Sequence, residues 1–179
     1  QLLNYNKTFG KHNVDLLLGH ESYNLQSYSI GATKSGMFSP SYLELDGMVT
    51  DMASASSGKA EYNNEGYFFR GQYNFDERVF VSGSYRRDAS SRFHPDNRWG
   101  NFWSVGAAWI LSKESWYNVD WLNMLKVKAS YGSQGNDNIG NYLYTYMYSI
   151  TNSDGEIAIK RSTIGNENIT WETNTNFNA

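Results

Sequence analysis

The chain has 179 residues, the length of a single domain, and carries a net charge of −3, so no basic surface argues for a nucleic-acid partner. It contains no Cys, which excludes disulfides, thiolate metal sites and cysteine nucleophiles. Aromatic residues make up 16% and charged residues 18% of the sequence. Mean hydropathy is nonetheless −0.63, because Asn, Ser, Thr and Tyr, rather than aliphatic residues, take the place of the missing charged residues. This mixture favours β-structure with one polar and one aromatic-rich face.

No apolar run approaches the roughly 20 residues of a membrane helix. That does not argue against a membrane location, because the strands of a membrane β-barrel alternate lipid-facing with lumen-facing residues. The chain opens at Gln1 within a strand-like pattern, so we expect no signal peptide in it.

Apolar residues at every second position predict the strands, as where Tyr67, Phe69 and Tyr73 alternate with polar neighbours such as Arg70 and Gln72. About seven strands are expected, most of them near the 9–11 residues of a membrane strand. In chain order they cover approximately residues 3–9, 14–21, 66–75, 79–88, 103–111, 125–132 and 169–177.

Short and long connections alternate between these strands. Tight turns are predicted at residues 10–12 and 76–77, and the 112–123 connection is expected to hold a short helical turn. Long loops are predicted at about 30–62 and 135–168, with a medium loop at 90–98. Outer-membrane barrels sort their connections in this way, with short periplasmic turns and long extracellular loops. A soluble β-sandwich has no reason to do so.

The two parities of the strands differ in chemistry. One face is apolar and is predicted to contact lipid through five representative residues: Val81, Val105, Trp109, Val127 and Tyr131. The opposite face carries Arg70, Arg86, Lys126 and Lys128 among Ser and Gly, as expected of a water-filled or plug-filled lumen. An antiparallel sandwich with one solvated face gives similar alternation and stays open as an alternative.

Four segments, in this order and spacing, resemble the SusC/RagA family of TonB-linked outer-membrane proteins from Bacteroidetes. They are YRRDASSRF with PDNRWG, SVGAAW, LKVKASYG with GN, and IGNENITWE, which lie within residues 85–100, 104–109, 125–136 and 164–172. The resemblance implies an all-β fold, an antiparallel transmembrane β-barrel segment supplying about seven strands of a 22-stranded plugged barrel. Residues 1–179 would then be part of the receptor's β-barrel domain, and we expect the plug domain and the C-terminal strands to lie outside them.

The resemblance also implies a function in the bacterial outer membrane. Such proteins import nutrients actively, as oligosaccharides (glycans) or peptides, with a SusD-like surface lipoprotein and the TonB complex as partners. The alternative from another class is a secreted all-β module that binds carbohydrate or builds a surface structure. An enzyme is not expected, because His12, His20 and His94 are scattered and no nucleophile or metal pair accompanies them.

The densest charge cluster is the first candidate site. It consists of Arg86, Asp88, Arg92, Asp96 and Arg98. These residues would either contact ligand or plug, or form a salt-bridge network that braces strand ends and loop at the barrel rim. The bracing role is favoured, because most charge runs are structural.

Tyrosines in the long loops are the second candidate site: Tyr42, Tyr142, Tyr144, Tyr146 and Tyr148. Aromatic side chains on extracellular loops would stack on sugar rings or grip a lid protein. The alternative is a strand from Tyr142 to Tyr148 that extends above the membrane, since Tyr at every second position is typical of a strand face.

Two Asn- and Asp-rich segments, residues 136–138 and 152–156, offer oxygen ligands of the kind that Ca²⁺ accepts. Neither has the spacing of a known calcium loop, and turn chemistry explains them more simply. No cofactor is therefore expected, and calcium is the one ligand left open.

Overall fold

The computed structural model describes residues 1–153 and 155–179, and it leaves the side chains of residues 49–52 and 153 undescribed. Almost all regular structure in the described part is β-strand. The strands are β1 (Leu2–Phe9), β2 (His12–Met37), β3 (Met48–Phe75), β4 (Val79–Ser90), β5 (Trp99–Ile110), β6 (Lys126–Asn136), β7 (Met147–Ser153), β8 (Glu156–Thr163) and β9 (Glu172–Asn178). Two single 3₁₀ turns accompany them, η1 (Leu45–Gly47) and η2 (Leu111–Lys113). No described helix is long and apolar enough to cross a membrane.

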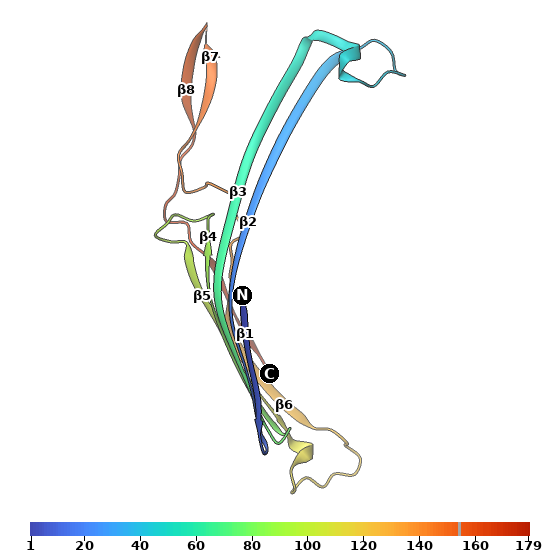
Figure 1. Cartoon of the computed structure of the whole chain (residues 1–179), viewed down its shortest axis with the longest axis vertical. Helices are drawn as coiled ribbons and strands as arrows, with labels where there is room; N and C mark the ends of the chain where they lie inside the picture. Colours follow the sequence, from blue (N-terminus) through green and yellow to red (C-terminus); the bar gives the residue numbers. More distant parts are fainter. Residues whose placement is uncertain (154) are drawn as a thin grey trace. The chain divides into compact units, whose positions relative to one another are not determined.

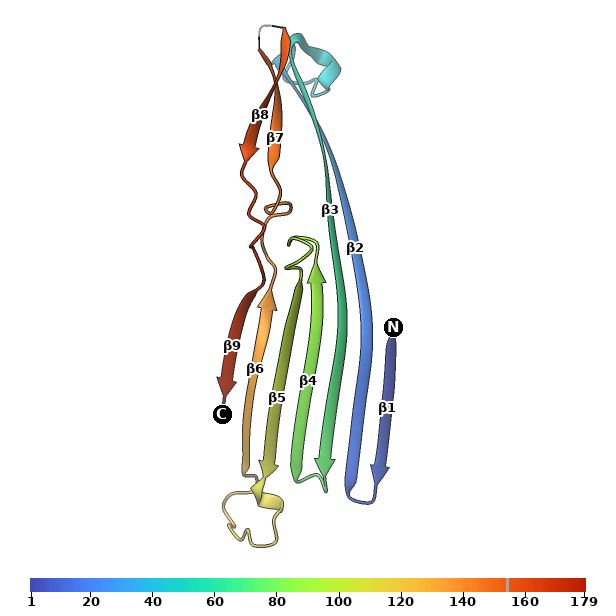
Figure 2. The same cartoon turned by 90° about the vertical axis from the view of Figure 1, so that its left-hand side faces the viewer.

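Seven strands form one sheet in the order β1-β2-β3-β4-β5-β6-β9, and β7 and β8 form a separate two-stranded sheet (Figures 1 and 2). The registers from β3 to β9, and those of β1 with β2 and β7 with β8, are all antiparallel. Neighbouring strands in the sheet are therefore neighbours in sequence, apart from the β7–β8 insertion. The predicted all-β, antiparallel fold class is confirmed.

The chain divides into two compact units. Unit 1 comprises residues 1–23 and 63–179, and unit 2 comprises residues 24–62. Strands β2 and β3 run through both units. Unit 2 holds the far parts of these two strands, which approach each other where the Ser29 hydroxyl donates to the Gly58 carbonyl (3.5 Å).

The long loop predicted at residues 30–62 is wrong. Strand β2 continues to Met37, β3 resumes at Met48, and only residues 38–47 connect them. Nearly every side chain from Asn24 to Met37 is exposed. Since alternation arises only where one face of a strand is apolar and the other polar, a strand solvated on both faces carries no period-2 signal.

The tight turns lie where they were predicted. Gly10 has a φ of 59°, and Asp76 and Glu77 have φ values of 51° and 52°. Left-handed backbone at both central residues is the geometry that joins twisted antiparallel strands across a two-residue hairpin turn. The short helical turn expected between residues 112 and 123 is η2, at the start of that connection.

The loop predicted at residues 135–168 also needs correction, because it contains the β7–β8 hairpin. The described residues thus hold nine strands rather than about seven. The alternative strand from Tyr142 to Tyr148 is wrong for its first half: strand begins at Met147, and Tyr142 has a φ of 64°, inside a turn closed by the Thr145 N–H on the Tyr142 carbonyl (3.0 Å).

Candidate functional site

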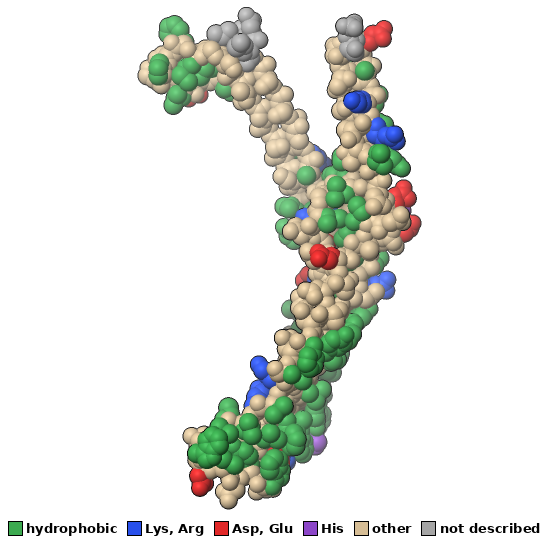
Figure 3. All heavy atoms as spheres, turned by 180° about the vertical axis from the view of Figure 1, so that it is seen from behind, with side chains coloured by type: hydrophobic (Ala, Val, Ile, Leu, Met, Phe, Trp, Pro, Cys, Tyr) green, Lys and Arg blue, Asp and Glu red, His purple; other side chains and the backbone are tan. Residues whose placement is uncertain are grey.

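The five residues predicted to contact lipid lie on one face of the sheet. Val81 pairs with Ala107, Val105 with Tyr131, and Trp109 with Val127. Directly paired residues point to the same side of an antiparallel sheet, and residues two apart along a strand do as well. Val81, Val105, Trp109, Val127 and Tyr131 are each 43–55% exposed. We call this side the apolar face, and Figure 3 shows hydrophobic side chains gathered along the lower part of the sheet. Contact with lipid itself stays a prediction.

Aromatic rings occur on the apolar face near both ends of the strands. Trp103 packs edge-on against Tyr131 with 5.5 Å between ring centroids, and Tyr67 lies parallel to Trp99 at 6.3 Å. Near the turn end, the Trp109 indole N–H donates to Glu114 (2.9 Å). Rings with an apolar body and a satisfied polar atom at both strand ends are typical of the two interfacial girdles of a membrane barrel.

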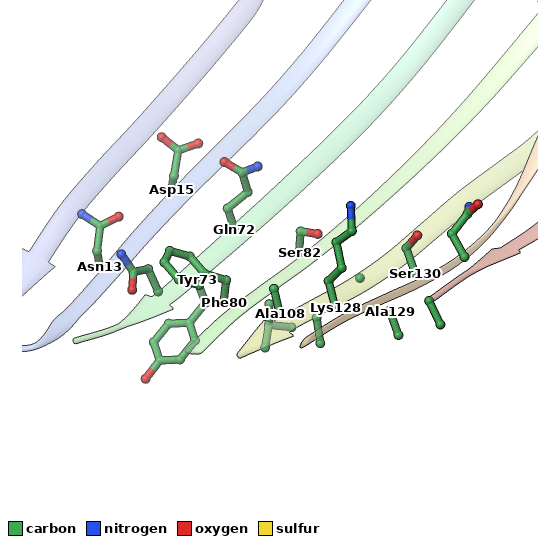
Figure 4. A pocket seen from close by; sticks show the side chains of 16 residues that line it. Asn13, Asp15, Gln72, Tyr73, Phe80, Ser82, Ala108, Lys128, Ala129 and Ser130 are labelled. Atoms are coloured by element: carbon green, nitrogen blue, oxygen red, sulfur yellow. The ribbon is translucent and has the colours of Figure 1, made fainter. Parts of the chain in front are cut away.

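The other side of the sheet, the polar face, is formed by the alternate residues. It carries a hollow of about 660 Å³, lined by Asn13, Asp15, Gln72, Ser82, Lys128, Ser130 and further residues. Figure 4 shows these polar side chains rising from one side of the strands while Tyr73 points to the opposite side. Amides, hydroxyls and a few charges here form a wettable surface rather than a protein core.

Arg86 is the centre of the charge on the polar face. Its Nε donates to the Asp88 carboxylate at 2.7 Å, a second nitrogen contacts Glu21, and the guanidinium lies 5.1 Å from the centre of the Phe68 ring. A Cβ at Gly66 would overlap the ends of the Asp88 and Arg86 side chains, so a larger residue there would have to displace them. Asp88 is only 6% exposed. Two carboxylates neutralise the guanidinium, which makes this a structural ion-pair site that joins β2 to β4.

A small aromatic core lies where β4, β5 and β6 meet the loops. Phe93 is fully buried, and its ring lies 5.3 Å from that of Trp171, which packs edge-on against Phe102 at 5.1 Å. A Cβ at Gly100 or Gly135 would overlap the Phe102 ring, so the ring packs directly against the backbone of these two glycines. This core is the most deeply buried part of unit 1.

Hydrogen bonds tie the 91–98 loop to the segments on either side of β7–β8. Ser90 donates through its hydroxyl to Asp137 (2.7 Å), and Arg92 donates to the Asp137 carbonyl (2.8 Å) and to Asn141 (3.2 Å). The Trp171 indole N–H donates to the Arg98 carbonyl (2.8 Å). Three connections that are far apart in sequence are therefore joined into one assembly, which we call the loop cluster.

The predicted single charge cluster is wrong in its extent. Arg86 and Asp88 belong to the sheet, whereas Arg92 belongs to the loop cluster with Asp137. Asp96 has an 85% exposed side chain, and its carboxylate lies 3.5 Å from the His94 ring. Arg98 contributes its backbone carbonyl, and its buried Nε has no hydrogen-bond partner among the described residues. The charges are divided because β4 ends at Ser90, so that Arg86 and Asp88 lie in the strand while the other three lie in the connection to β5.

Ion pairs at the turn end of the sheet lower two carboxyl pKa values. The hydrogen bond from Lys11 (3.0 Å) holds the pKa of Asp76 below its usual value, with smaller contributions from the charges of Arg78 and Lys113. The hydrogen bond from Lys113 (2.8 Å) lowers the pKa of Glu77 in the same way. These pairs link the two-residue turn to the neighbouring connections at the same end.

The five loop tyrosines do not form one site. Tyr42 lies in unit 2, where a Cβ at Gly47 would overlap its ring. In unit 1, the Tyr144 ring packs edge-on against the His94 ring with 5.9 Å between centroids. The Arg161 guanidinium lies 6.0 Å from the centre of the Tyr146 ring. Tyr148 is on β7 and 61% exposed, and Tyr142 is 39% exposed. Their role in ligand or lid contact stays a prediction.

The two candidate calcium segments form turns where they are described. The Asn136 side-chain oxygen accepts from the Asn138 N–H (2.9 Å), and the Asn152 oxygen accepts from the Gly155 N–H (2.9 Å). Asp154 and the side chain of Ser153 lie outside the described residues. Within the described part, no group of three His, Asp or Glu side chains is placed to hold a metal ion.

The residues that organise the loop cluster were not predicted as a site. Phe93 and Trp171 belong to the segments that carry the family resemblance, and Asp137 belongs to a candidate calcium segment, but none of the three was predicted to organise the loops. The one signal in the sequence is the pair of glycines at 100 and 135, each within a strand. Glycine inside a strand marks a close approach, but it does not say which ring approaches.

Comparison with known proteins gives consistent results. Residues 1–179 match the family described as TonB dependent receptor-like, beta-barrel. TonB-dependent receptor P3 of Formosa agariphila is 30% identical over 182 residues, covering 96% of this chain and 18% of that protein. TonB-dependent receptor SusC of Bacteroides thetaiotaomicron is 28% identical over 186 residues, covering 98% of this chain and 18% of that protein. A chain in the structure of the RagAB peptide transporter matches with a TM-score of 0.89 and 31% identity, covering 98% of this chain and 20% of that one. The chain thus spans about a fifth of the length of these relatives.

Proposed function

Because the chain belongs to the TonB-dependent receptor-like β-barrel family, we propose that it is part of the wall and loops of an outer-membrane importer. The importer would take up nutrients with energy supplied through TonB. The resemblance to SusC and RagA is borne out by the similarity to SusC itself and to RagAB. These relatives are receptors and transporters, which supports a function other than catalysis.

One observation from the fold carries the proposal: the sheet is a single layer with two chemically different faces. Val105 and Val127 stay 52% and 55% exposed on the apolar face, while the polar face holds a hollow lined in part by amide, hydroxyl and charged side chains. In water the apolar face would have to be covered, and in a barrel wall lipid covers it. The polar face then borders the path of the cargo.

Arginine substitution on the two faces tests this assignment. Val105 pairs with Gly83 on β4. Ser82 is the residue next to Gly83, so it lies at nearly the same depth in the wall as Val105 but points to the opposite face. In the full-length receptor, Val105→Arg should impair barrel assembly, because Arg near the bilayer midplane costs about 2–4 kcal/mol. Ser82→Arg, which projects into the hollow, should assemble like the wild type. Heat-modifiable migration of membrane fractions measures both variants.

A soluble module predicts a different outcome. A receptor that is recovered without detergent, or equal sensitivity of both positions to Arg, would show that the apolar face is a protein core and would contradict the importer. A tolerated Val105→Arg beside a defective Ser82→Arg would reverse the two faces.

We further propose that the importer works with a SusD-like surface lipoprotein and carries oligosaccharides or peptides. The support is the likeness to SusC and to the RagAB importer, whose cargo is peptide. The loops of this chain would then face the lipoprotein and the cargo. Tyr144 and Tyr146, at the base of the β7–β8 hairpin, are the aromatic residues that we expect to contact them.

Replacement of the two tyrosines tests the role of the loops. A receptor with Tyr144→Ala and Tyr146→Ala should assemble normally but should lose growth on the nutrient or co-purification of the lipoprotein. Tyr28→Ala, which removes a 77% exposed ring from β2, is the control. Normal growth and normal co-purification of the double variant would assign recognition to other parts of the receptor. Failed assembly would assign the two rings to the structural loop cluster.

A further inference from the structure

Two consecutive arginines on β4 have opposite environments. Arg86 lies on the polar face and is neutralised by Asp88 and Glu21. Arg87 lies on the apolar face, because it pairs with Tyr67 on β3 and with Asn101 on β5. Asn101 is two residues from both Trp99 and Trp103 along β5, so these three side chains point to the same side of the sheet. Arg87 is exposed, and no carboxylate among the described residues forms an ion pair with it.

Arg87 packs on one member of a row of aromatic rings on the apolar face. Its guanidinium lies 5.0 Å from the centre of the Trp99 ring. Trp99 is next to Tyr67, and Tyr67 stacks on His20 with ring centroids 4.6 Å apart. The interaction with Trp99 holds the guanidinium against the sheet and leaves its N–H edge open.

Glu65 is an acidic residue on the same face, where it pairs with Ala89, two residues along β4 from Arg87. Glu65 accepts from the Tyr67 hydroxyl (2.7 Å) and contacts His20 (3.2 Å) through the same oxygen. The ion pair that Glu65 forms in the described part of the chain is with His20, and none joins it to Arg87 there. A guanidinium in an apolar girdle without a counter-charge is unfavourable unless the surroundings supply an anion.

A second donor lies beside Arg87. The Tyr85 hydroxyl donates to the side-chain oxygen of Asn101 (2.7 Å), which fixes the amide so that its NH₂ group remains a donor. Because Asn101 pairs directly with Arg87, both donor groups are at the same level of the sheet. Arg87 is three residues from the end of β4, which places it about 10 Å below the strand end at a rise of about 3.3 Å per residue.

From this geometry we propose that Arg87 and Asn101 bind the phosphate of a membrane-lipid headgroup on the outside of the barrel wall, at the end bearing the 91–98 loop. The inference rests on the proposed location in an outer membrane. The guanidinium edge presents two parallel N–H donors to phosphate oxygens, and the Asn101 amide adds a third. Trp99 and Tyr67 support the site by packing on the guanidinium and on the upper acyl chain.

Retention of lipids that differ only in the phosphate tests the site. The full-length receptor, purified in a non-ionic detergent, is incubated with dioleoyl phosphatidic acid or with dioleoylglycerol, and native mass spectrometry counts the bound lipid. We expect the wild type to retain the phosphate lipid about tenfold better, consistent with charge-assisted hydrogen bonds. Arg87→Gln should lose this preference, and Arg87→Lys should keep only part of it, because an ammonium lacks the two-pronged geometry.

Two further variants make the result specific. Asn101→Asp keeps Arg87 but supplies a carboxylate from the chain, and it should lower phosphate-lipid retention as strongly as Arg87→Gln. Arg161→Gln removes another arginine that lies against an aromatic ring, on the β7–β8 hairpin, and should leave retention unchanged. An equal loss with Arg161→Gln would reduce the effect to overall charge and would overturn the site.

Inorganic phosphate separates the two sources of the same chemistry. If an equal concentration of inorganic phosphate displaces the lipid fully, the ligand is a soluble anion and the headgroup proposal is wrong. Unchanged lipid retention in Arg87→Gln also overturns the headgroup proposal. That result does not contradict the proposed importer as long as Val105→Arg still blocks assembly. If Val105→Arg and Ser82→Arg are equally tolerated, both proposals are wrong.

Discussion

Phe102 shows how a single ring determines which residues its neighbours can be. It lies on the polar face at the loop end of β5, and a Cβ at Gly100 or at Gly135 would overlap it. Beyond the ring, Trp171 closes the contact edge-on. Glycine at these positions is required by the approach of a ring, since neither residue has a left-handed backbone.

Substitution of Gly135 by Ala should therefore destabilise the loop end of the sheet. Forcing a methyl group into a packed contact costs about 1–3 kcal/mol, through displacement of Phe102 and then of Trp171. Gly83→Ala is the matched control, since a Cβ there would have its nearest neighbour 3.9 Å away, at the Ser104 carbonyl. The thermal midpoint of heat-modifiable migration in the full-length receptor measures both. Equal midpoints for the two variants would mean that the ring can move freely.

At this scale, the sequence predicted the side of the sheet but not the contacts. Strand parity placed Val81 and Val105 on one face and Arg86 on the other, because the side-chain period of a strand is two residues whatever the fold. Phe93 and Trp171 are 78 residues apart in the sequence, and their contact depends on how three connections fold over one another. Local pattern contains no information on such a long-range pair.

The 76–77 turn shows how a connecting element is stabilised by its surroundings. Neither Asp76 nor Glu77 is the glycine that left-handed backbone prefers, yet each is tied by its side chain to a lysine of another connection. Their pKa values are lowered in the folded state. The contribution to stability is then fully present above the ordinary carboxyl pKa, about 4, and is lost as the pH falls through the lowered values.

Removal of both lysines should show this pH dependence. The full-length receptor with Lys11→Gln and Lys113→Gln should be slightly less stable than the wild type at neutral pH, because the ion pairs are exposed and screened. The difference should begin to shrink below about pH 4, where the carboxylates of the unfolded chain take up protons, and should vanish once the folded carboxylates are protonated at their lowered pKa values. Thermal midpoints at a series of pH values give the comparison, with Lys34→Gln as the control. A difference that grows on acidification would contradict the sign of the pKa shifts.

Strands were predicted well only where one of their faces is apolar. The 79–88 prediction corresponds to β4 and the 125–132 prediction to β6, because both have an apolar face opposite a polar one. The far part of β2 and the hairpin β7–β8 lie where the sequence predicts loops. In β7–β8, Ile150 pairs with Ile159, and their side chains are 75% and 69% exposed. Most other described side chains of these two strands are exposed as well, so neither strand has one apolar and one polar face.

For the molecule as a whole, the testable quantity is which end of the sheet faces the outside of the cell. The antiparallel order places the 76–78 turn and the 111–125 connection at one end of unit 1, and the 91–98 loop with the loop cluster at the other. Outer-membrane barrels keep short turns on the periplasmic side and long loops outside. We therefore expect the loop cluster on the cell surface.

Two matched cysteines measure this sidedness directly, because the chain has no Cys of its own. Glu77 precedes β4 and Asp96 comes after it, so the two residues lie beyond opposite ends of this strand. Their side chains are 77% and 85% exposed, so a thiol at either position would be accessible to a reagent on its own side of the membrane. In intact cells, a membrane-impermeant maleimide should label Asp96→Cys in the full-length receptor and should leave Glu77→Cys unlabelled until the outer membrane is permeabilised. Labelling of both positions in lysed cells is the control for assembly. If Glu77→Cys is labelled in intact cells and Asp96→Cys is not, the wall has the opposite orientation, and the loop tyrosines would face the periplasm, where they could meet neither cargo nor a surface lipoprotein.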